Sequence, residues 1–144
     1  MATSTWSGPI RAGTIREGAS ENVGTVVLAQ SAPYIQTAAT AAATAIILPA
    51  GAHILEVQVV VTTACDGASQ NLSVGTSVTS TEIFSALALG TAANTIFFGS
   101  AATITDGDVW ENVGTADVTI WVVTSAGTAG RGSITVTYTQ GEAL

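Results

Sequence analysis

The residues best suited to chemistry are few and scattered along the chain. It has one histidine, His53, and one cysteine, Cys65. Nucleophilic catalysis needs a nucleophile, a base and a group that orients the base, and no Gly-x-Ser-x-Gly turn marks a nucleophilic serine. A zinc site needs several cysteine or histidine ligands. We therefore expect no enzyme, with His53 a polar strand-end residue and Cys65 a small buried hydrophobe.

Three aspartates stand in glycine-containing turns and are candidate ligands for a hard cation. Asp66 precedes Gly67, and Asp106 and Asp108 flank Gly107. Loop carboxylates suit calcium, but Asp-Gly is also a common solution for a tight turn. We expect structural turns and no metal or other cofactor, and ion binding at these aspartates stays open as the alternative.

The three tryptophans are the other residues that could recognise a ligand. Trp6, Trp110 and Trp121 could stack on sugar rings, but tryptophan is also enriched at the centres of protein interfaces. Trp121 lies opposite the apolar residues of its own segment, and Trp110 begins a predicted strand, in the core or at its rim. We favour subunit contacts for Trp110 and Trp121.

The composition indicates that other subunits cover part of the apolar surface of this chain. Hydrophobic residues make up 47% of the sequence and charged residues only 9%, against about 25% charged residues in average domains. The apolar runs are shorter than the roughly 20 residues that a membrane-spanning helix needs. A membrane protein is therefore not expected, and the excess apolar surface predicts an assembly.

The charge distribution separates an N-terminal arm from the rest. The net charge is −7, with three arginines and no lysine, too few cations for nucleic-acid binding. Residues 1–16 contain Arg11 and Arg16 and no acid. Residues 1–22 are rich in glycine, serine and threonine and predict an extended arm, with Trp6 and Ile10 as apolar anchors for a partner.

The remainder, residues 23–144, is predicted to be one all-β domain, with core strands over about 45–140. Runs of alternating apolar and polar residues recur every 8–12 residues between turns, which is typical of a β-sandwich or jelly roll. In residues 54–62, the positions of Leu55, Val57, Val59 and Val61 predict the buried face. The Ala/Thr tract 37–44 is the one place where a short helix is an alternative.

Several stretches resemble a β-sandwich module of tailed-bacteriophage virion proteins. They are Leu48–Val57, Val59–Gly67, Leu72–Thr76 and Gly130–Val136, and Ser7–Gly13 is similar to the opening of small marine phage structural proteins.

The resemblance implies a capsid decoration, or cement, protein that stabilises the shell as a homotrimer on the capsid surface. Its partner would be the major capsid protein, which Trp6, Ile10, Arg11 and Arg16 of the arm would contact. Met1–Trp6 lacks the features of a secretory signal, so synthesis in the host cytoplasm is expected. The alternative is a receptor- or carbohydrate-binding module of a head fibre or tail spike.

Overall fold

A computed structural model of the 144-residue chain describes residues 26–36, 40–67, 70–78, 82–99 and 113–139. These residues contain eight β-strands and no helix. The strands are β1 Val27–Ile35, β2 Ala42–Leu48, β3 His53–Thr63, β4 Asn71–Gly75, β5 Phe84–Ala88, β6 Thr95–Phe98, β7 Val118–Thr124 and β8 Arg131–Thr139.

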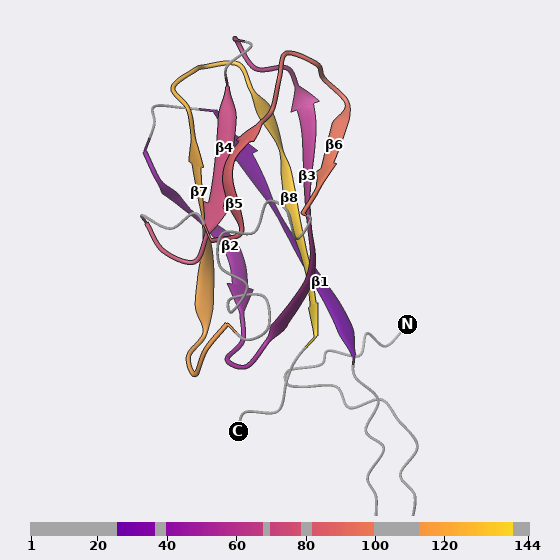
Figure 1. The fold of residues 1–144 in the computed structure, drawn as a ribbon, viewed down its shortest axis with the longest axis vertical. Helices are drawn as coiled ribbons and strands as arrows, with labels where there is room; N and C mark the ends of the chain where they lie inside the picture. Colours follow the sequence, from indigo (N-terminus) through magenta and orange to yellow (C-terminus); the bar gives the residue numbers. More distant parts are fainter. Residues whose placement is uncertain (1–25, 37–39, 68–69, 79–81, 100–112, 140–144) are drawn as a thin grey trace, which may run out of the picture.

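The strands form two four-stranded antiparallel sheets. Sheet A has the order β1-β8-β3-β6 and sheet B the order β2-β7-β4-β5, and Figure 1 shows them as two layers. Strands pair as nested partners, β1 with β8, β2 with β7, β3 with β6 and β4 with β5. The all-β, β-sandwich prediction is confirmed, and the jelly roll stays a prediction. The predicted arm, residues 1–22, lies outside the described residues.

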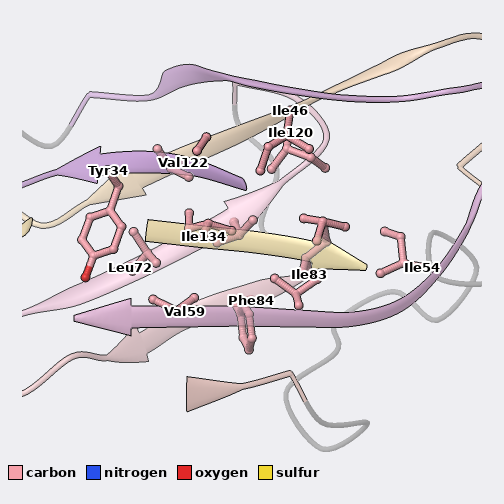
Figure 2. Close-up of a cluster of buried hydrophobic side chains, with 14 of the residues drawn as sticks. Tyr34, Ile46, Ile54, Val59, Leu72, Ile83, Phe84, Ile120, Val122 and Ile134 are labelled. Atoms are coloured by element: carbon pink, nitrogen blue, oxygen red, sulfur yellow. The ribbon is translucent and has the colours of Figure 1, made fainter. Parts of the chain in front are cut away.

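The core forms between the sheets because successive strand residues point to opposite faces. On β8, Ile134, Val136 and Tyr138 are buried while the residues between them are only partly covered, which follows the alternation of apolar and polar residues in this segment. Figure 2 shows side chains from both sheets meeting in this layer, among them Ile134 of β8 in sheet A and Ile120 of β7 in sheet B. Burying each such side chain stabilises the fold by about 1.5–3 kcal/mol.

The prediction of the buried face of β3 is wrong at Leu55, the first residue of the predicted set. Ile54 is buried, whereas Leu55 is 52% exposed. The register between β3 and β8 shifts between Ile54 and Glu56, so Leu55 is an extra residue in a β-bulge. Beyond the bulge the expected pattern returns, with Val57, Val59 and Val61 buried. A bulge inverts the alternation locally, which periodicity alone does not show.

The helix alternative for the Ala/Thr tract is also wrong where the tract is described. β2 begins at Ala42, inside the tract and a few residues before position 45, where the core strands were predicted to begin. Its register against β7 shifts between Ala43 and Ile47. There the Thr44 hydroxyl donates to the Ile120 carbonyl (2.8 Å) and accepts from the Ile46 amide (3.1 Å), so a threonine side chain replaces ladder bonds inside the irregularity.

Candidate interaction surfaces

The residues with catalytic potential do not come together in the structure. His53 is exposed at the start of β3, and Cys65 is buried and unbridged. The described residues contain no group of three or more His, Cys, Asp or Glu side chains that could hold a metal ion. Within the described part of the chain there is also no helix long and apolar enough to cross a membrane. Asp106 and Asp108 lie outside the described residues.

Asp66 holds the loop between β7 and β8 in place. Its carboxylate accepts bonds from the Thr128 amide (2.8 Å), the Thr128 hydroxyl (3.0 Å) and the Ala129 amide (3.2 Å). These bonds favour the ionised form, so the two backbone amides first, and then the hydroxyl, lower the pKa of Asp66. The carboxylate therefore has a structural role, which is to hold the loop that contains Thr128 and Ala129.

A buried glutamine closes the same end of the sandwich. Gln36 is 1% exposed. Its side-chain nitrogen donates to Gln70 Oε1 (2.7 Å), and its oxygen accepts from the Gly130 amide (3.0 Å). A Cβ at Gly130 would stand 2.6 Å from Cys65 Sγ, so only glycine fits there. The network joins segments at the ends of both sheets.

Tyr34 lies inside the sandwich beside this network, and its hydroxyl is buried without a hydrogen-bond partner. Burial, and then the nearby Cys65, raise the pKa of Tyr34 to about 12. The ring occupies space left free by its cross-strand neighbour, because a Cβ at Gly132 would stand 2.7 Å from the Tyr34 hydroxyl. We interpret Tyr34 as a packing residue of the core.

Among the residues that the structure describes, the two outer sheet faces are the candidate interaction surfaces. On sheet A, four large apolar side chains are exposed on the edge strands: Val27 and Ile35 of β1, and Ile96 and Phe98 of β6. Across the sheet, Ile96 pairs with Val60 and Phe98 with Gln58. β8 lies between β1 and β3 and pairs with both of them. Its outward residues are Ser133, Thr135, Thr137 and Thr139. Glu56 and Arg131 are the charged residues of this face.

The outer face of sheet B is centred on Trp121. Its buried neighbours on β7, Ile120 and Val122, point into the core, and Trp121 itself is half-buried, as its place opposite the apolar residues predicted. Its cross-strand neighbours are Ala43 on β2 and Gly75 on β4. A large ring is thus flanked by two of the smallest residues.

Sequence reasoning missed the Ile96 and Phe98 pair, although the alternation within Thr95–Phe98 contains the signal. Alternation alone does not show that β6 is an edge strand, and this position in the sheet is what exposes its outward side chains. The other predicted contact residues, Trp6, Ile10, Arg11, Arg16 and Trp110, lie outside the described residues, so their roles stay predictions.

Neither a known protein family nor a curated protein matches the sequence. Among solved structures, the fold is similar to a chain of the capsid asymmetric unit of cyanophage Pam1, and to a chain of the capsid of Ralstonia phage GP4. The TM-score is 0.61 and the identity 18% in both cases. The match covers 88% of this chain, and 93% and 92% of the respective capsid chains.

At this identity the likeness shows a shared fold. The class is a small β-sandwich of a kind present in phage capsids.

Proposed function

We propose that the protein is a structural component of a phage virion that decorates the capsid and stabilises the shell. The observation that carries the proposal is the match over nearly the whole length of single chains in two phage capsids. A small chain that forms one β-sandwich is suited to bind to a capsid as a separate subunit. The partner in this proposal is the major capsid protein, and the site is the capsid surface.

The surface chemistry supports a role in assembly rather than catalysis. The exposed apolar residues Ile96, Phe98 and Val27 lie on one sheet face among serines and threonines. Exposed apolar patches of this kind mark protein contacts. We propose that this face of sheet A rests on the shell, with the arm residues 1–22 extending the contact, and that the protein has no enzymatic activity.

Many identical weak contacts suffice for such a role. A homo-oligomer, with the predicted trimer as the first expectation, attaches through several copies of one site, so its avidity exceeds the affinity of each contact. The proposal therefore requires neither a deep pocket nor a cofactor.

Co-sedimentation of the full chain with capsids that lack it tests the proposal. Saturation at a fixed high copy number per shell is expected. No binding, or a handful of copies at one vertex, would contradict the cement role and favour the fibre or spike module. A chain without residues 1–16 is expected to bind much more weakly while it keeps its β-sheet circular dichroism. Undiminished binding would remove the arm from the contact.

A further inference from the structure

We propose that the outer face of sheet B is where copies of this chain pack against one another. The face consists of outward residues on three adjacent strands: Ala43, Ala45 and Ile47 of β2, Thr119, Trp121 and Val123 of β7, and Ser73 and Gly75 of β4. This inference deepens the proposed function by naming the surface that holds an oligomer together, but it can be tested without any capsid.

Charge is the first reason to place a second copy there. Each chain carries a net charge of −7, so a contact through an uncharged surface avoids bringing further like charges close together. None of the eight residues of this face is ionisable. The outer face of sheet A, in contrast, carries Glu56 and Arg131, and desolvating a charge without a partner is costly.

The shape of the face is the second reason to place a second copy there. A contact between identical copies needs a projection and a matching recess on the surface that the copies share. Trp121 provides the projection, and the exposed Ala43 beside it on β2 provides the recess, whereas Gly75 on the β4 side is already buried in the single chain. Around a symmetry axis, Trp121 of one copy can therefore lie over Ala43 and Ala45 of the next.

The exposed apolar groups of the face gain from such a contact. Ile47 is 50% exposed and pairs across the sheet with Thr119, and Trp121 is still partly exposed in the single chain. Tryptophan at the centre of a desolvated patch is a frequent energetic hot spot of protein interfaces. Covering these groups removes them from water, which is favourable at about 25 cal/mol per Å².

Two matched substitutions test the inference on the full chain. Ala45 and Ala29 are both exposed alanines on edge strands, Ala45 on sheet B and Ala29 on sheet A. Ala45→Glu places a charge in the proposed contact, and Ala29→Glu places the same charge on the other face. Molar mass is measured by light scattering, with circular dichroism to verify the fold.

We expect an oligomer for the wild type and for Ala29→Glu, and a monomer for Ala45→Glu. Trp121→Ala is expected to shift the equilibrium toward monomer by at least tenfold. A monomeric wild type, or an Ala45→Glu variant with the mass of the wild type, would overturn the inference. An oligomer that fails to bind capsids would leave this inference standing and contradict the proposed function instead.

Discussion

The side-chain amide of Gln30 bonds both backbone groups of Ile47. Gln30 Nε2 donates to the Ile47 carbonyl (2.6 Å), and Gln30 Oε1 accepts from the Ile47 amide (3.0 Å). A glutamine on β1 of sheet A thus takes the place of a neighbouring strand at the edge of sheet B. The same nitrogen donates to the Tyr138 hydroxyl (2.8 Å). Such an arrangement links the sheets and satisfies groups that an open edge would offer to other chains.

Gln30→Ala is therefore expected to lower the free energy of unfolding by about 1–3 kcal/mol, since hydrogen bonds at a partly buried site are lost together. Urea denaturation measures the change. Gln58→Ala, on the outer face of sheet A, is the matched control and is expected to cost less than about 0.5 kcal/mol. Equal losses in the two variants would show that the bonds to Ile47 contribute nothing.

Ala86 has a φ of 52°, in the left-handed region that costs a residue with a Cβ about 1–2 kcal/mol. It lies in the bulge of β5, where its amide donates to the Ser73 hydroxyl (3.0 Å). Ala86→Gly is expected to raise the free energy of unfolding by about 0.5–1 kcal/mol, because glycine adopts this conformation without strain.

Ala88→Gly, on the same strand but not among the positive-φ residues, is the control for Ala86. There the added flexibility of the unfolded chain is expected to lower stability by about 0.5–1 kcal/mol. Opposite signs for the two substitutions are the result to look for in denaturant titrations. A destabilised Ala86→Gly protein would show that the backbone at this position is not strained.

Acid is expected to loosen the loop that Asp66 holds. Hydrogen bonds from Thr128 and Ala129 lower the pKa of Asp66 in the folded chain. Its stabilising contribution is therefore present above its unfolded pKa of about 3.9 and is lost as the pH falls through the folded value. Asp66→Asn should lower the Tm at pH 7. It should also weaken the dependence of the Tm on pH between about pH 5 and 2. Curves for the two proteins that run parallel over this range would contradict the assignment.

Alkaline pH is expected to lower the stability of the fold through ionisation of Tyr34. Its pKa in the folded chain is raised to about 12, so its contribution is complete below the unfolded value of about 10 and is lost as the pH rises toward 12. Tyr34→Phe should raise the free energy of unfolding at pH 7 by about 1 kcal/mol, because an unpartnered buried hydroxyl is removed. It should also reduce the loss of stability above pH 10.

Tyr138→Phe provides the contrast for Tyr34. The Tyr138 hydroxyl accepts a bond from Gln30, so its removal leaves a donor without that partner. This variant is expected to be less stable than the wild type by about 1 kcal/mol at pH 7. Stabilisation by both substitutions, measured by thermal unfolding, would argue that neither hydroxyl is used.

The sequence by itself determined the all-β class and much of the core, because strand alternation is a local property. The alternation of Ile134, Val136 and Tyr138 predicts an inner face that the structure has, and the same rule placed Trp121 on the outside. It also excluded zinc and catalytic clusters as expectations, since the required residue types are too few.

Only the tertiary structure decided which strands pair, in which register, and which distant residues are in contact. A bulge at Leu55 reversed its predicted burial, since an extra residue changes the alternation in a way that depends on the partner strand. The bonds from Gln30 to Ile47 and the position of Trp121 between Ala43 and Gly75 depend on strands far apart in the sequence. Pairing and register come from packing over the whole sandwich, and no local pattern in the chain encodes them.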